Sequence, residues 1–413
     1  MNLFTKKKKE FHISFKVVCM AVTINIKKNE IRVTDPSSIG VLSKSFYGVM
    51  DKGEIILFPE EALYLADIRN AKCYDDAGNL YSFNDLASLF LKHKKLMARY
   101  FTYKDWRDRG LIVRPMNELN SKYERSPIKK YPSKKITFDK YAIDGLFFED
   151  DLISIIDEPI IGKELYDKYW IGQFASYKAE QRGNISKLDI YETLFLLNHS
   201  NYKLKNAGKK EVQKAGLKVH KNFNLMYDVY EDWRLIGFVL KTGFKFGTHF
   251  RLYFPGASPT RSNKEWIHSK HVVHIFPKSS KMIISEWARA IRVAHSVKKT
   301  FILAIPGEEE KKKEEKTKQK NASHLDFLLY HRVKGGIETP KDGQPKYLMF
   351  SLSEEESIGG QELSEAIQEC ADVGLQLLLA IADRETSVTY YLVKRIDLPG
   401  SKYEYYEIDW VQP

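Results

Sequence analysis

The sequence of 413 residues predicts a mixed α/β (α+β) chain that is built from tandem small α/β modules. Two internal repeats support this prediction, because each repeated segment combines strand-like apolar runs with helix-like apolar spacing. A chain of this length also exceeds what one hydrophobic core usually organises, so several domains are expected. We therefore predict modules of two types, each present in two copies.

The first repeat joins a segment that begins at Ile31 to one that begins at Ile153. IRVTDPSSIGVLSKSFYG reads against ISIIDEPIIGKELYDKYWIG, and the later YKDWRDRG reads against YEDWRLIG. Between these anchors both copies carry an apolar pattern typical of a helix, EEALYLADI and IYETLFLLN. The repeat predicts one N-terminal-type module over residues 22–117 and a second copy over residues 144–241.

The second repeat predicts a different module over residues 242–305 and again over residues 323–413. FRLYF and WARAIRVAHSVKKTFILAI read against FLLYH and LSEAIQECADVGLQLLLAI, a strand followed by a helix and another strand. The remaining segments are expected to be a tail (1–21), a linker rich in lysine and proline (118–143) and a charged linker (306–322). The charged linker, PGEEEKKKEEKTKQKNA, is either a solvated tether or a frayed helix.

The charge balance favours a polyanionic partner. Lys and Arg number 66 against 54 Asp and Glu, a formal net charge of +12, and phosphate contacts by such a chain release counterions. A basic protein without such a partner is the alternative. Cys19, Cys73 and Cys370 are far apart and form no Cys-x-x-Cys pair, which argues against a disulfide framework and a structural zinc site. A reducing compartment, the cytoplasm, is therefore expected.

The N-terminus superficially resembles a signal peptide, because four lysines precede an apolar stretch. Glu10, His12 and Lys16 interrupt that stretch and no long apolar run follows, so we expect no membrane segment. A tail, or a start placed too early with Met20 as the alternative, fits better.

Common metal and nucleotide signatures are absent from the sequence. There is no His-Glu-x-x-His, paired-cysteine or Gly-x-x-x-x-Gly-Lys motif, so no metal site and no cofactor are expected. His271 and His274 alternate in the strand HVVHIF and fit packing or surface positions. Gly243 and Gly247 fit a bend that leads into a strand rather than a phosphate loop.

Three proton-active residues lie at the ends of predicted elements between residues 241 and 305. Tyr253 closes the strand FRLY, His268 precedes KHVVHIF, and Lys299 lies between a helix and the strand TFILAI. The helix carries an apolar stripe, formed by Ile284, Trp287, Ile291 and Ala294, and a polar stripe, formed by Arg289, Arg292, Ser296 and Lys299. Taken alone, this pattern also fits an ordinary amphipathic helix with a solvated basic face.

At these residues the sequence resembles the archaeal tRNA-splicing endonucleases (tRNA-intron endonucleases). The matching motifs, in the order and spacing of that family, are YEDWRLIGFVLKTGFKFGTHFRLYFPG (230–256), HSKHVVHIFP (268–277) and RVAHSVKKTFILAI (292–305). The resemblance implies that Tyr253, His268 and Lys299 are catalytic and that Arg292 stacks on a bulged base. The sequence departs from the family at His249, where an acidic residue is usual, and this leaves the local hydrogen bonding open.

The resemblance also implies a reaction. Precursor tRNA would be cut at bulge-helix-bulge exon–intron junctions by transesterification without metal, which leaves 2′,3′-cyclic phosphate and 5′-hydroxyl ends. Tyr253 would act as general base, His268 as general acid, and Lys299 would stabilise charge in the transition state. A neighbouring ammonium group favours the phenolate form of a tyrosine that must accept a proton.

The C-terminal copy retains only part of this group. Tyr330 corresponds to the catalytic tyrosine, but Gln344 and Leu375 replace the histidine and the lysine. Residues 323–413 are therefore expected to be a degenerate, structural nuclease module, residues 242–305 the catalytic module and residues 22–117 a non-catalytic module. This arrangement resembles the three-unit, single-chain form of the enzyme, which works as a homodimer.

Two loops are candidates for further contacts. Asp383 and Glu385 lie in IADRETSVTYY, where the family uses an acidic loop at its dimer interface; a plain hairpin turn is the alternative. The insertion QFASYKAEQRGN (173–184) offers Lys178 as an RNA contact, or is inert.

Two other functions remain to be weighed against an RNA endonuclease. A non-catalytic RNA-binding or assembly subunit would not need the three residues together. A metal-dependent DNA nuclease would need clustered carboxylates, which the sequence does not show.

Overall fold

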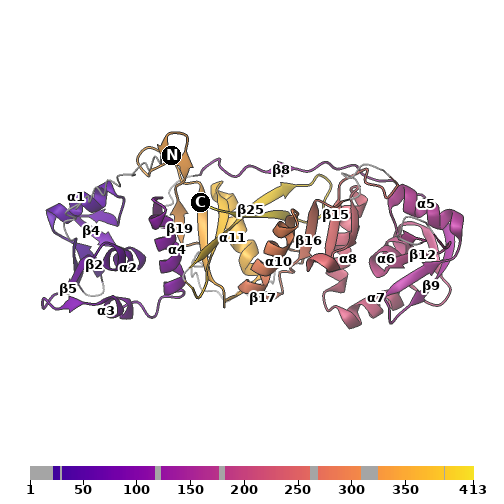
Figure 1. Ribbon diagram of the computed structural model, residues 1–413, viewed down its shortest axis with the longest axis horizontal. Coiled ribbons are helices and arrows are strands. Elements are labelled where there is room, and N and C mark those ends of the chain that lie inside the picture. Colours follow the sequence, from indigo (N-terminus) through magenta and orange to yellow (C-terminus); the bar gives the residue numbers. More distant parts are fainter. Residues whose placement is uncertain are drawn as a thin grey trace, which may run out of the picture. The chain divides into compact units, whose positions relative to one another are not determined.

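The structure is a computed structural model that describes residues 22–27, 30–116, 122–175, 182–260, 268–307, 324–385 and 387–413. The chain divides into two compact units, residues 1–96 and 97–413. Each unit combines helices with mixed sheets, which confirms the predicted mixed α/β class (Figure 1). No helix among the described residues is long and apolar enough to cross a bilayer.

The first unit contains one mixed sheet with helices α1 (Pro36–Lys44), α2 (Pro59–Ile68) and α3 (Phe83–Ser88). Its described strands lie in the order β3 (Val49–Asp51), β4 (Glu54–Leu57), β2 (Glu30–Val33), β1 (Thr23–Lys27), β5 (Lys72–Asp75) and β6 (Leu80–Tyr81). The β1 and β5 strands are parallel, and the other neighbours are antiparallel. Buried Glu61 accepts hydrogen bonds from the backbone N–H groups of Gly48 and Phe58, each at 3.1 Å, and so ties α2 to the preceding turn.

The second unit opens with helix α4 (Leu96–Asp108), and residues 142–235 within it form a comparable sheet and helices. The described strands of that sheet lie in the order β11 (Gln173–Phe174), β12 (Ser186–Asp189), β10 (Ile153–Ile156), β9 (Ala142–Phe148) and β13 (Asn201–Leu204). The helices are α5 (Pro159–Tyr169), α6 (Ile190–His199), α7 (Lys209–Val219) and α8 (Phe223–Leu235). The strand order matches that of the first unit, and β9 and β13 are parallel as β1 and β5 are. Buried Glu192 accepts hydrogen bonds from the backbone N–H groups of Gly172 and Asp189, just as Glu61 accepts from those of Gly48 and Phe58. This shared topology supports the predicted duplication, which stays a prediction.

A long sheet forms the rest of the second unit (Figure 1). Its main path runs β14 (Val239–Thr242), β15 (Phe250–Tyr253), β16 (His271–Ile275), β18 (Thr300–Ala304), β26 (Tyr405–Val411), β25 (Val388–Asp397), β24 (Gln376–Ala382), β22 (Tyr347–Ser353), β19 (Phe327–Leu329) and β7 (Val113–Pro115). Helix α10 (Ile284–Ser296) connects parallel β16 and β18, and α11 (Gly360–Val373) connects parallel β22 and β24. Smaller pairs join β17 (Lys281–Ile283) to β23 (Ser357–Gly359) and β20 (Arg332–Val333) to β21 (Gly336–Ile337).

The predicted modules share this sheet. Strand β26, from the predicted degenerate module, pairs with β18 of the predicted catalytic module through Phe301↔Ile408 and its neighbours. Strand β7, from the predicted module over 22–117, pairs with β19. The segment boundaries therefore do not coincide with breaks in hydrogen bonding.

The predicted linker 118–143 contains a packed segment, residues 122–136, which we call the connector. Its Tyr123 N–H donates to Val373 O at 2.7 Å, and Lys134 N–H donates to Ile236 O at 2.9 Å. Tyr131 is 3% exposed, and strand β8 (Lys129–Lys130) pairs with β25. The connector is thus part of the fold rather than a loose tether.

Candidate active site

The ends of three elements bring Tyr253, His268 and Lys299 to one cavity of about 420 Å³. Tyr253 ends β15, His268 lies just before β16, and Lys299 lies between α10 and β18. The pairing of Leu252 with His271, together with the parallel register of β16 and β18, places these three ends at the same edge of the sheet. The three residues that the sequence singled out therefore lie together.

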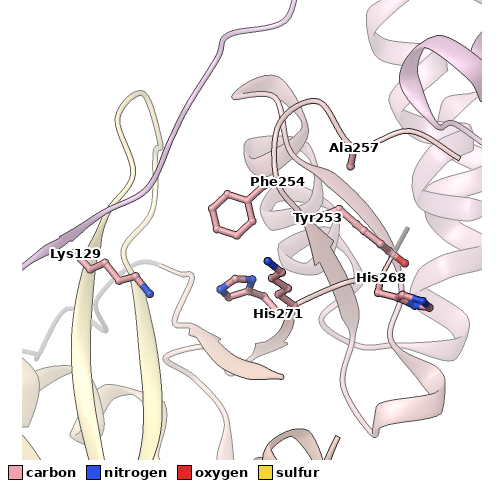
Figure 2. A pocket seen from close by; sticks show the side chains of 7 residues that line it. Lys129, Tyr253, Phe254, Ala257, His268 and His271 are labelled. Atoms are coloured by element: carbon pink, nitrogen blue, oxygen red, sulfur yellow. The ribbon is translucent and has the colours of Figure 1, made fainter. Parts of the chain in front are cut away.

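The Tyr253 ring is held by aromatic packing. Tyr253 is 5% exposed, and its ring centroid lies 4.6 Å from that of Trp170 at the end of α5. Tyr166, Phe174 and the strand residue Val239 belong to the same apolar cluster. Figure 2 shows the phenol oxygen of Tyr253 pointing toward the His268 ring. The packing leaves the hydroxyl as the part of the side chain that faces the cavity.

Lys299 is fixed by neutral groups. Its Nζ donates to the carbonyl oxygen of Ser269 and, at 2.9 Å, to Ser269 Oγ, and it lies 4.7 Å from the ring centroid of Phe246. Burial, with a smaller contribution from the charge of Arg251, lowers the pKa of Lys299 below its ordinary value. None of these contacts is to a carboxylate, so they leave the positive charge of this cavity-lining lysine uncompensated.

The opposite wall of the cavity carries a buried ion pair. Lys241 Nζ lies 2.5 Å from Glu192 Oε1 and donates to Gly172 O at 2.9 Å. Asp189 caps α6 by accepting from Glu192 N at 2.8 Å, and burial followed by the charge of Glu192 raises the pKa of Asp189. The charged groups of Lys241, Glu192 and Asp189 are therefore already paired with other groups of the cavity wall. Within the described ranges, no group of three or more His, Cys, Asp and Glu side chains is arranged to hold a metal ion.

The departure at His249 is accommodated by a backbone hydrogen bond. His249 Nδ1 accepts from Ile275 N at 3.0 Å, and burial lowers the pKa of His249 to about 4. His274 packs between the rings of His249 and Phe301, at centroid distances of 4.6 and 5.8 Å. His274 thus packs against two rings, one of the two placements expected for it, whereas His271 lines a second cavity beside the candidate active site.

The predicted peripheral residues lie apart from the catalytic group. Arg292 is exposed on α10 and is not among the described residues that line the cavity. Asp383 Oδ1 accepts from Glu385 N at 2.9 Å and Ser387 N at 2.8 Å, a bonding pattern that fits the hairpin alternative, while the Glu385 side chain is exposed. Lys178 and most of the charged linker lie outside the described residues.

The corresponding region of the degenerate module is covered by the connector. Leu375, at the position of Lys299, is 1% exposed in the core, and the carbonyl oxygen of Gln344 accepts from Arg125 Nη1 at 3.2 Å. Arg125 also binds Glu338 through two contacts of 2.6 Å, and Arg125 N–H donates to Gly374 O at 2.8 Å. The connector thus packs over this region, where it and the end of α11 line a cavity of about 610 Å³ that includes Leu375 in place of a lysine.

Several residues at the site had not been predicted from the sequence. Trp170 contacts Tyr253, Phe246 and Ser269 contact Lys299, and Lys129 reaches the second cavity from the predicted linker. Phe246 and Ser269 lie inside or beside the matching motifs, which is the only sequence signal that pointed to them. Trp170 and Lys129 come from segments 80 or more residues away in sequence, and only the fold brings them near.

Comparisons with known proteins agree with this geometry. Residues 223–315 match the family described as tRNA intron endonuclease, catalytic C-terminal domain. A tRNA-splicing endonuclease from Methanococcus maripaludis is 33% identical over 158 residues, which are 37% of this chain and 84% of the relative. One from Methanococcoides burtonii is 25% identical over 346 residues, 68% of this chain and 94% of the relative. The chain therefore belongs to the tRNA-splicing endonuclease family.

Proposed function

We propose that this endonuclease cuts precursor tRNA at bulge-helix-bulge exon–intron junctions by transesterification without a metal ion, and so acts as a tRNA-intron lyase. The observation that carries the proposal is the meeting of Tyr253, His268 and Lys299 in one cavity. The 2′-hydroxyl attacks the adjacent phosphorus, its proton passes to a base, and the P–O5′ bond breaks. The products are a 2′,3′-cyclic phosphate and a 5′-hydroxyl, so atoms and charge balance without an external reactant.

Each residue has a role that matches its surroundings. Tyr253 accepts the proton of the 2′-hydroxyl, and the ammonium group of Lys299 favours the phenolate form that this requires. His268 donates a proton to the leaving 5′-oxygen. Lys299, held by Ser269, stabilises the charge that develops on the phosphoryl oxygens.

The proposal is tested with a bulge-helix-bulge RNA in excess EDTA. Cleavage to cyclic phosphate is expected, and a 2′-deoxy nucleotide at the cut site should abolish it. Cleavage that appears only after magnesium is added would contradict the proposal. RNA binding without any cleavage would favour a non-catalytic subunit instead.

The roles of the residues are tested by single-turnover cleavage with Tyr253→Phe, His268→Ala and Lys299→Gln. Each variant should lose about 10²-fold or more in rate, the usual scale for a general acid or base or a charge-stabilising donor. Lys298→Gln is the matched control, because Lys298 is the exposed neighbour of Lys299 and carries the same charge. Equal rates for the Lys298 and Lys299 variants would remove the lysine from the mechanism.

We further propose that the protein acts as a homodimer. A precursor needs two cuts, and each chain carries one complete set of catalytic residues. Glu385, exposed at the β24–β25 hairpin, is the candidate interface residue, with Asp383 shaping the turn. Sedimentation should show a dimer that Glu385→Lys weakens and that Asp342→Lys, an exposed acid in another loop, does not. A fully active monomer would refute this assembly.

The remaining RNA contacts are assigned to Arg292 and Lys178. Arg292, exposed on α10 with its side chain interacting with Tyr391, would stack on a bulged base, and Lys178, which lies outside the described residues, would contact phosphate. Arg292→Ala should weaken binding of a bulged RNA more than Arg289→Ala, an exposed arginine on the same helix. Lys178→Ala should reduce cleavage of at least some precursors; unchanged cleavage of every precursor would exclude that role.

A further inference from the structure

A second cavity, of about 330 Å³, adjoins the catalytic cavity. Its lining residues are Lys129, Tyr253, Phe254, Ala257, His268, Lys270 and His271. Tyr253 and His268 line both cavities, whereas Lys299 lines only the catalytic one. The two spaces therefore meet at the base and the acid of the proposed mechanism.

The wall of this cavity combines an aromatic surface with an unused polar atom. The ring of Phe254 packs against the rings of His271 and Tyr131, at centroid distances of 4.9 and 5.3 Å. His271 is 7% exposed, and its buried Nδ1 has no hydrogen-bond partner in the part of the chain that the structure describes. A buried polar atom without a partner costs free energy, so a ligand that supplies one is favoured there.

A cation reaches the cavity from the connector. Strand β8 pairs in parallel with β25, with Lys129 opposite Ile396 and Lys130 opposite Asp397. Lys129 Nζ lies 2.8 Å from Glu407 Oε1, while more than half of its side chain remains exposed. Figure 2 shows the end of the Lys129 side chain directed toward the His271 ring, with the Phe254 ring beside them. Because successive side chains of a strand point to opposite faces, Lys130 points away from Lys129.

We infer that this cavity binds the nucleotide immediately 3′ of the scissile phosphate. Its base lies against Phe254 and hydrogen-bonds His271 Nδ1, and Lys129, which keeps its ion pair with Glu407, donates a further hydrogen bond to its phosphate. An aromatic face with nearby cations is how proteins commonly hold a single-stranded base, and the cavity has the size of a small-molecule site.

The 3′ side is chosen by the chemistry of the site, so the inference rests on the proposed function. His268 protonates the 5′-oxygen of the leaving nucleotide, and His268 also lines the second cavity. We assign the strand direction so that RNA passes from the Lys299 side of the catalytic cavity past His268 into the second cavity, which Lys299 does not line. In this direction the base 5′ of the cut stays on the Lys299 side.

The test combines an abasic RNA with protein variants in single-turnover cleavage. Removing the base 3′ of the cut should lower the wild-type rate at subsaturating enzyme about tenfold, since a stacked base contributes on the order of 1–3 kcal/mol. Lys129→Gln and His271→Leu should lower cleavage of the intact RNA and show a smaller further loss with the abasic RNA. His271→Asn, which restores a polar atom near the Nδ1 position, should recover part of the His271→Leu loss.

Controls separate this inference from the proposed function. Lys130→Gln should cut both RNAs at the wild-type rate. Removing the base 5′ of the cut should lower the cleavage rate by the same factor in Lys129→Gln as in the wild type. The subsite is refuted, while the proposed reaction stands, if the wild type cuts the intact and the 3′-abasic RNA at equal rates. It is also refuted if the rate loss from the Lys129 or His271 substitution and the rate loss from removing the 3′ base multiply as independent factors. If the intact RNA is not cut at all, it is the proposed function that fails.

Discussion

Three histidines in β16 and the turn before β15 are kept neutral by the fold. Burial lowers the pKa of His249 and His271 to about 4 each and that of His274 to about 3. For His249 and His274 a further lowering comes from a neighbouring imidazole, His220 and His249 respectively. These groups bind fewer protons in the folded state than in the unfolded state, where an imidazole has a pKa near 6.5.

We predict that stability falls as the pH is lowered from about 7 toward 4. Because the folded pKa values are depressed, the unfolded state takes up more protons, and each histidine contributes a slope of up to about 1.4 kcal/mol per pH unit in that window. Urea unfolding at pH 7.5 and 5.5 measures this. His274→Leu should reduce the slope by about one proton, and an unchanged slope in that variant would show that His274 is not a source of it.

An aromatic residue with a left-handed backbone follows the first long helix in both N-terminal-type modules. Trp170 has a φ of 50° and Phe46 has a φ of 59°, although residues other than glycine rarely adopt this backbone conformation. Phe46 is the second residue after α1 and Trp170 the first residue after α5, so the two lie within one position of each other relative to the ends of these helices. In the second module the aromatic ring packs on Tyr253, so this backbone conformation places a ring against the proposed general base.

We therefore predict different outcomes for Trp170→Gly and Phe46→Gly. Both substitutions place glycine, which tolerates positive φ, at a left-handed position and delete an aromatic ring. Only Trp170→Gly removes a ring that packs against Tyr253. A displaced base should lower kcat by about ten- to a hundredfold with a smaller change in KM. The Phe46 variant should keep wild-type kcat, and a similar loss in both variants would assign the effect to general destabilisation.

At the scale of elements, a repeated glycine shows how the connector is held. Gly110 and Gly237 end the matching helices α4 and α8 and have φ of 77° and 100°. A Cβ at Gly110 would meet no described atom within 4 Å, whereas one at Gly237 would lie 2.4 Å from Lys134 O of the connector. The two positions share a backbone conformation and differ in a backbone contact.

This difference predicts the effects of two alanine substitutions. Gly110→Ala should cost about 1 kcal/mol, the usual penalty for a side chain at positive φ, while Gly237→Ala should cost at least about 2 kcal/mol more because the connector must move. Denaturant unfolding measures the costs, and limited proteolysis should show new cleavage within residues 122–136 only for Gly237→Ala. Equal costs and equal protease resistance would mean that the connector does not depend on this contact.

The sequence predicted individual elements better than their partners. The stripe Ile284, Trp287, Ile291 and Ala294 correctly predicted the buried face of α10, since apolar spacing reports which side of a helix is covered. The three candidate catalytic residues could be picked out because each lies at the end of an element within a motif, and they line one cavity. Lys129 and Trp170 could not, because neither is marked by local pattern. The connector was predicted as a linker from its prolines and lysines, which do not disclose that Tyr131 packs into a core.

At the scale of the whole chain, one sheet is continuous across the predicted modules of residues 97–413. Periodicity identifies a strand but does not say which distant strand lies beside it, and β18 finds its neighbour β26 about 100 residues away. Strand β26 also pairs with β25, so it joins the catalytic half of the sheet to the degenerate half. The degenerate module thus contributes structure to the catalytic one within the same chain.

A chain that ends at residue 401 should therefore lose cleavage, although it keeps Tyr253, His268 and Lys299. The truncation removes β26 with its fully buried Tyr405 and Ile408, and leaves β18 as an exposed apolar edge that favours aggregation. Soluble yield and single-turnover cleavage measure the effect. A chain that ends at Val411 is the matched control, because it lacks only Gln412 and Pro413 beyond the strand and should retain activity. Full cleavage by the shorter chain would show that the catalytic half of the sheet is stable without β26, and that the degenerate module serves only RNA binding or assembly.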